Sequence, residues 1–221
     1  MDDLKIYGSG TVTSGKYKTI SIMGDGTVNG DVECVALNVN GQCDVSGNLK
    51  SETVKINGSS SVNGPLETKN IRVNGEIGVS GDLSAEKIRV NGDMDVEGDC
   101  DAETCTLRGE FTVAGHLNAG NLKIDLYGPC EVKEIGGEKI TVKKEMGFHF
   151  LIKNIFASGV SGSKLTTDVI EGDEIRLEHT EANVVRGNDV IIGEGCEIGL
   201  VEYRNSFKRN ENAKVGRHTK V

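Results

Sequence analysis

Four acidic residues recur at multiples of 17 along the chain, and paired carboxylates of this kind could in principle act as acid and base on a glycosidic bond. They are Asp25, Glu76, Asp93 and Glu110. Such chemistry needs two carboxylates converging in a cleft, whereas an even spacing distributes them along one wall. Their spacing therefore favours a role in solubility, and a carbohydrate-active or acyltransferase β-helix enzyme stays a minor alternative.

The remaining residues with chemical potential do not form a recognisable site. The four histidines, at 116, 149, 179 and 218, are scattered, and no sequence logic links one of them to a Ser or Cys nucleophile. The six cysteines lack the close pairs that are typical of metal sites. The glycine-rich phrases lack the GK[ST] of a phosphate loop. We therefore predict no catalytic, cofactor-binding or metal-binding residues, and no enzyme.

The amino-acid composition further limits the functional class of the protein. The 221 residues contain 25 Lys and Arg against 34 Asp and Glu, a net charge of −9, which argues against nucleic-acid binding. The start, MDDLKIYGSG, lacks the apolar region of a signal peptide, and no run approaches the roughly 18 apolar residues of a spanning helix. We expect a cytoplasmic protein with reduced thiols and no small-molecule substrate.

A regular glycine repeat organises the chain. One glycine series falls at 24, 41, 58, 75, 92 and 109, a second falls at 30, 47, 64, 81, 98 and 115, and both have a period of 17. Counting each copy from its first glycine, apolar or small residues occupy positions 3 and 5, 9 and 11, and 14 and 16. Each pair has the two-residue period of a strand. The second glycine and an Asn-Gly step provide corners between the pairs.

Three short strands per copy predict a triangular turn, and stacked turns predict an all-β parallel β-helix. Equivalent positions would then lie about 4.8 Å apart on successive rungs. No rung can bury its apolar side chains alone, so neighbouring rungs must stabilise one another. The Asn residues before the corner glycine could form a ladder of side-chain amides: Asn40, Asn57, Asn74 and Asn91. We expect roughly ten rungs in all.

The repeat divides the chain into five segments. We predict an irregular first rung at 1–23, regular rungs at 24–142, an insert at 143–164, less regular rungs at 165–203 and a basic tail without periodicity at 204–221. In the C-terminal rungs we pair Ala182 with Val184 on the inward side. In the insert an apolar stripe has helical spacing, which predicts an amphipathic helix that packs on the wall or docks a partner or membrane. Its residues are Phe148, Leu151, Ile152, Ile155 and Phe156.

A basic ladder runs along outward position 15 of this acidic protein. It consists of Lys55, Arg72, Arg89 and Lys123. These side chains could pair with corner acids such as Glu52, Glu86 and Glu103, or form a docking stripe for an anionic surface or partner.

Two phrases carry a family resemblance: GDLSAEKIRVNGDMDVEGD and VIEGDEIRLEHTEANVVRGNDVIIGEGCEIGLVEY. They resemble the bactofilins, bacterial polymer-forming cytoskeletal proteins. The resemblance implies a right-handed β-helix that polymerises end to end without nucleotide. It also implies a scaffold for cell-shape, envelope or appendage machinery. The chain differs from the family pattern in the insert at 143–164.

Polymerisation also follows from the ends of a stack, which present unpaired strand edges. We expect the N-terminal contact to use Leu4, Ile6, Val12, Ile20 and Ile22. We expect the C-terminal contact to use Val190, Ile192, Ile198, Val201 and Tyr203. The predicted partner is the chain itself, with a related sister protein and a peripheral membrane or envelope protein as further candidates. The alternative is a non-polymerising adaptor that docks through the insert.

Overall fold

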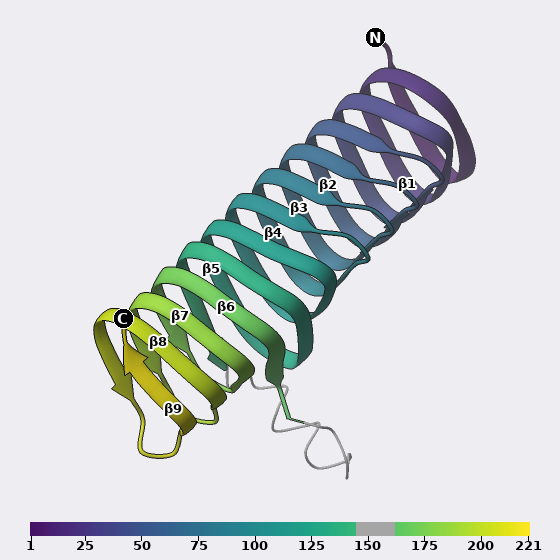
Figure 1. Cartoon of the computed structure of the whole chain (residues 1–221). Helices are drawn as coiled ribbons and strands as arrows, with labels where there is room; N and C mark the ends of the chain where they lie inside the picture. Colours follow the sequence, from purple (N-terminus) through teal and green to yellow (C-terminus); the bar gives the residue numbers. More distant parts are fainter. Residues whose placement is uncertain (145–161) are drawn as a thin grey trace, which may run out of the picture.

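The computed structural model describes residues 1–144 and 162–221. Within them the chain winds into one elongated solenoid built of a single parallel sheet, and the strands follow one another in chain order from end to end (Figure 1). The strands are β1 (Asp3–Val45), β2 (Leu49–Val62), β3 (Leu66–Val79), β4 (Leu83–Val96), β5 (Cys100–Lys144), β6 (Lys164–Leu177), β7 (Thr180–Ile192), β8 (Glu197–Arg209) and β9 (Lys214–Lys220).

The strands wrap around a common axis for about ten turns, which confirms the predicted all-β parallel β-helix. Val54 pairs with Ile71 and Ile71 with Ile88, so neighbouring strands are offset by the predicted period of 17. The elements β1 and β5 are long because the backbone runs through several corners without losing strand pairing. In residues 1–144 and 162–221 no helix is long and apolar enough to cross a membrane.

The Asn ladder forms as predicted at one corner. The Nδ2 of Asn57 donates to Oδ1 of Asn40 at 3.0 Å, Asn74 donates to Asn57 at 2.9 Å, and Asn91 donates to Asn74 at 3.0 Å. Every bond runs in the same direction, because each amide donates to the rung before it. Side-chain hydrogen bonds therefore reinforce the backbone ladder along this edge.

The core is a continuous column of Val, Ile and Leu, and the described cysteines lie within or beside it as buried free thiols. Burial raises the pKa of the Cys43, Cys100 and Cys130 thiols to about 12. A thiol with so high a pKa is almost entirely protonated near neutral pH, so these groups act as small apolar side chains.

The C-terminal rungs differ from the sequence prediction in two ways. After Ala182 the next buried residue of β7 is Val185, whereas Val184 is only half-buried. The predicted inward pairing of Ala182 with Val184 is therefore wrong. Ala182 and Val185 are three residues apart, like the inward residues Ala85 and Ile88, so a corner lies between them and they do not share one strand face. The prediction that the repeat ends after Tyr203 is also wrong. The strand β8 continues to Arg209, and β9 adds a further strand. The predicted apolar stripe at 148–156 lies outside the described residues.

Candidate interaction surfaces

The N-terminal end of the stack consists of the first turn of β1. The N–H of Lys18 donates to the carbonyl of Asp2 at 3.0 Å, a span of 16 residues, whereas the corresponding bond in a regular rung spans 18, as from Ser46 to Val28. The first turn is therefore shorter than a regular turn. It contains Leu4, Ile6 and Val12, while Ile20 and Ile22 lie one turn further in and are fully buried. Of the five predicted contact residues, Leu4 is therefore the one that keeps partly exposed surface at this end.

Tyr17 adds to this end, although the repeat pattern does not identify it as an inward residue. Its ring packs half-buried against the core, and its hydroxyl donates to the carbonyl of Thr13 at 3.0 Å. Tyr17 lies in the copy that is one residue short, so its inward orientation does not follow from the numbering of the regular repeat.

The C-terminal end has a different set of outermost residues from the predicted one. Val190, Ile192, Ile198 and Val201 are buried, because β8 and β9 cover them, and Tyr203 is half-buried. Tyr203 instead belongs to an aromatic row with Phe207 and His218. The ring centroids are 5.5 Å apart for Tyr203 and Phe207, and 5.0 Å apart for Phe207 and His218.

The last turn of the solenoid is incomplete. The short strand β9 pairs with residues 197–203 of β8, and residues 206–209 pair with β7 on one side. Within the described chain no strand covers the outer side of 206–209. Phe207 thus packs on the core at an open edge, together with the half-buried Val215. The sequence held a usable signal for Phe207, since it lies one repeat length after its partner Val190.

The basic ladder splits into two parts. Lys55, Arg72 and Arg89 are directly stacked in the strand register and exposed. No acidic partner for these three lies within the described residues, and Glu52, a predicted partner, instead contacts Lys69 at 3.5 Å. Lys123 is separated from Arg89 by the rung of Thr106. Lys123 therefore does not continue the stack of adjacent cations.

Lys123 belongs to a buried charge cluster at the end of the Asn ladder. The Oδ2 of Asp125 lies 3.0 Å from Nε of Arg108 and 3.1 Å from Nζ of Lys123. The side chain of Asp125 is fully buried, whereas those of Arg108 and Lys123 are about half exposed. Its Oδ1 has no hydrogen-bond partner in the described chain. The two cations thus compensate a carboxylate that has no contact with solvent.

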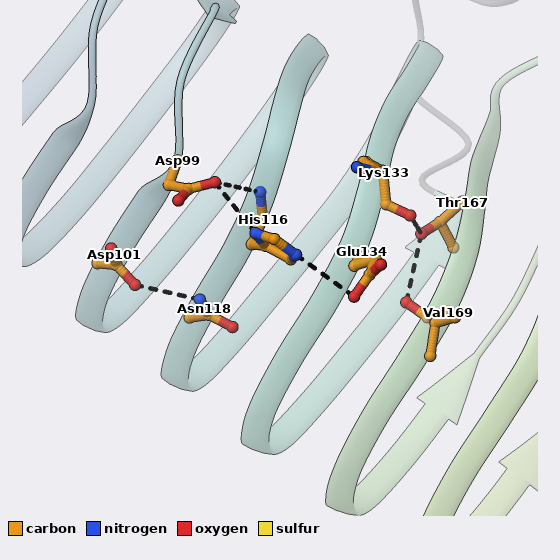
Figure 2. Close-up of polar contacts among 8 residues, drawn as sticks. All are labelled: Asp99, Asp101, His116, Asn118, Lys133, Glu134, Thr167 and Val169. Carbon is orange, nitrogen blue, oxygen red and sulfur yellow. Dashed lines mark hydrogen bonds and ion pairs between the residues drawn. The ribbon is translucent and has the colours of Figure 1, made fainter.

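His116 connects three successive rungs (Figure 2). Its backbone N–H donates to Oδ1 of Asp99 at 2.8 Å, its Nδ1 lies 3.2 Å from the same oxygen, and its Nε2 lies 3.4 Å from Oε2 of Glu134. The hydrogen bonds to His116 lower the pKa of Asp99, and the bond from the backbone N–H has the largest effect. Both ring nitrogens face carboxylates, so the imidazole of His116 links the rung of Asp99 to the rung of Glu134.

Further polar contacts reinforce the same wall. Asn118 donates to Asp101 at 3.2 Å, and the hydroxyl of Thr167 lies 3.1 Å from the carbonyl of Lys133 (Figure 2). Over residues 1–144 and 162–221, no group of three or more His, Cys, Asp or Glu is arranged to hold a metal ion. The polar side chains here link rungs to one another.

The chain is similar to a known protein family and to two proteins of known sequence. Residues 1–78 match the family model of the bactofilins, which is described as polymer-forming cytoskeletal. Two uncharacterized proteins of Bacillus subtilis (strain 168) are similar over 106 residues, 48% of this chain: YhbF at 42% identity and YhbE at 38%. These matches span 41% of YhbF and 43% of YhbE, less than half of either relative. No solved structure matches the chain significantly. The resemblance to the bactofilins is thereby confirmed for residues 1–78, the part of the chain that is similar to this family.

Proposed function

We propose that the protein is a nucleotide-independent scaffold whose copies polymerise end to end through the first and last turns of the solenoid. The observation that carries the proposal is that β1 and β9, the two ends of the sheet, each pair on one side within the described chain. An unpaired parallel edge is a template for another strand, and the rung repeat gives that strand a matching backbone.

The side chains at the two ends support the same contact. Leu4 and Tyr17 at one end, and Tyr203, Phe207 and Val215 at the other, pack against the core while they remain partly exposed. A second copy would bury these surfaces, which adds an apolar contribution to the backbone hydrogen bonds. The scaffold would position envelope, cell-shape or appendage machinery, with the chain itself or a related sister protein as partner.

Sedimentation and negative-stain microscopy of the purified full chain without nucleotide test this function. We expect pelletable filaments, and we expect Phe207→Asp to reduce the pelleted fraction strongly, because it places a charge in the end contact. Val35→Asp is the matched control, since Val35 is exposed on the side of the stack at 43%. A wild-type chain that stays monomeric at tens of micromolar would contradict the proposal. Filaments that form equally well with both variants would also do so.

A further inference from the structure

Two ladders of opposite sign, each made of residues of like charge, occupy neighbouring walls of the solenoid. The cationic ladder consists of Lys55, Arg72 and Arg89, which are paired in register on β2, β3 and β4. The acidic ladder consists of Glu76, Asp93 and Glu110, which are paired in register on β3, β4 and β5. All six side chains are exposed. The Asn-Gly corner separates the two ladders along the chain.

These ladders contrast with the other charges of the wall. Several other charged side chains have a partner of opposite charge on another rung, as in the ion pairs of Lys16 with Glu33 at 2.6 Å and of Lys50 with Glu67 at 2.6 Å. Glu181 and Glu197 are like-charged neighbours, but each also contacts a lysine. In the two ladders, like charges lie directly opposite at about the 4.8 Å strand spacing, an arrangement that is destabilising. Within the described residues none of the six forms an ion pair, and Glu76 accepts a hydrogen bond from Ser59 at 3.3 Å.

We propose that the cationic ladder of one copy binds the acidic ladder of a second copy side by side. Both ladders have three charges with the same rung spacing, so one correct ion pair brings the other two into register. The acidic ladder begins one rung later, and a shift of one rung therefore aligns Lys55 with the second copy's Glu76. This alignment applies to copies that run in the same direction. In copies that run in opposite directions Lys55 meets Glu110 instead, and three ion pairs still form.

The repeat itself selects a second copy as the occupant. A parallel stack of strands is a surface on which charges recur about every 4.8 Å along a straight line. An anionic membrane offers no such fixed repeat, and it would be repelled by the acidic ladder around the corner and by the net charge of −9.

Lateral binding goes beyond the proposed end-to-end contact and does not require it. Exposed ion pairs contribute little individually, so single copies would associate weakly. Where copies are joined end to end, consecutive ladders act together and the avidity rises. The expected product is therefore a side-by-side pair of filaments, or a weak lateral dimer where end contacts are blocked.

Charge reversal in both ladders provides the test. We expect K55E/R72E/R89E and E76K/D93K/E110K each to weaken lateral association of the full chain about tenfold or more. Analytical ultracentrifugation of the Phe207→Asp background measures this separately from end-to-end growth, and microscopy of the wild-type background measures filament pairing. Mixing the two reversed variants should restore association, since an intact cationic ladder then meets an intact acidic ladder.

The controls separate ladder pairing from general charge effects. K50E/K69E/K139E makes the same change in charge at exposed lysines outside the ladder and should leave association within about twofold. Association should also fall between about 0.1 M and about 1 M salt, as the Debye length shortens from about 10 Å to about 3 Å. No recovery on mixing would overturn the proposal. So would ladder-dependent binding to phosphatidylglycerol vesicles by a chain that shows no lateral association.

Discussion

Gly75 lies directly against Gly58 on the preceding rung, so closely that a Cβ at Gly75 would overlap the carbonyl oxygen of Gly58. Gly75 also has a φ of 132°, a region that L side chains rarely adopt. The two constraints recur at every glycine of the first series, with φ between 122° and 145° at Gly24, Gly41, Gly58, Gly75, Gly92 and Gly109. They explain why the glycine series is the strictest feature of the repeat.

Replacing this glycine should therefore open the stack. We expect Gly75→Ala to destabilise the protein by about 3 kcal/mol or more, because backbone strain and the overlap with Gly58 add together. Gly78→Ala is the matched control on the same strand, since its added Cβ meets nothing within 4 Å. The control should change stability by about 1 kcal/mol at most. Urea unfolding followed by circular dichroism measures both, and equal midpoints for the two variants would contradict the steric account.

The buried carboxylate of Asp125 gives a second prediction. R108Q/K123Q removes both cations and leaves a fully buried carboxylate without compensation, so we expect a loss of about 3 kcal/mol or more. Adding Asp125→Asn should restore part of that loss, because the uncompensated charge is then gone. K50Q/K69Q removes two exposed ion pairs instead and should cost about 1 kcal/mol or less. Thermal unfolding compares the four proteins, and the absence of any recovery in the triple variant would argue against a role for the buried charge.

The regular part of the fold could be predicted because one residue type repeats for one physical reason. At the corner of the first glycine series, from Gly24 to Gly109 in steps of 17, glycine is strongly favoured. The positions of these glycines therefore give the 17-residue register of the strands. Beyond β5 the offset between paired positions changes, to 15 for Leu165 and Thr180 and to 16 for Glu181 and Glu197. A bulge between Gly187 and Asp189 then returns the offset to 17 for Asp189 and Ser206. A fixed period fails across these changes, so β9 was not predicted, and the 17-residue spacing from Val190 to Phe207 was not used.

Side-chain pairing was harder to predict than register. The ladder positions of Lys55, Arg72 and Arg89 followed from the repeat, but their partners did not. Whether Glu52 reaches Lys55 or Lys69 depends on which wall each side chain faces, and the corner between positions 11 and 14 places Glu52 with Lys69. The partly buried residues at the two ends were missed for a related reason. The numbering identifies inward positions, but it does not indicate which rung has a neighbour to cover it.

The terminal strand β9 should loosen in acid. Nζ of Lys214 lies 3.1 Å from Oε1 of Glu197, and this hydrogen bond, followed by the attraction of the Lys214 charge, lowers the pKa of Glu197 below its usual 4.5. A folded-state pKa below the unfolded value means that the contribution to stability is present above the unfolded pKa and is lost as pH falls through the folded pKa. We therefore expect the link between β8 and β9 to weaken below pH 4.5.

Hydrogen exchange of the β9 amides measures this change. The Lys214 N–H, which donates to the carbonyl of Cys196 at 2.9 Å, is a direct reporter. Its protection factor, corrected for the intrinsic pH dependence of exchange, should fall a few-fold between about pH 6 and about pH 3.5. Glu197→Gln should have low protection at both pH values, whereas Glu211→Gln, an exposed residue at the same end, should behave like the wild type. Protection that falls equally in the wild type and in Glu197→Gln would show that another group controls the acid sensitivity of β9.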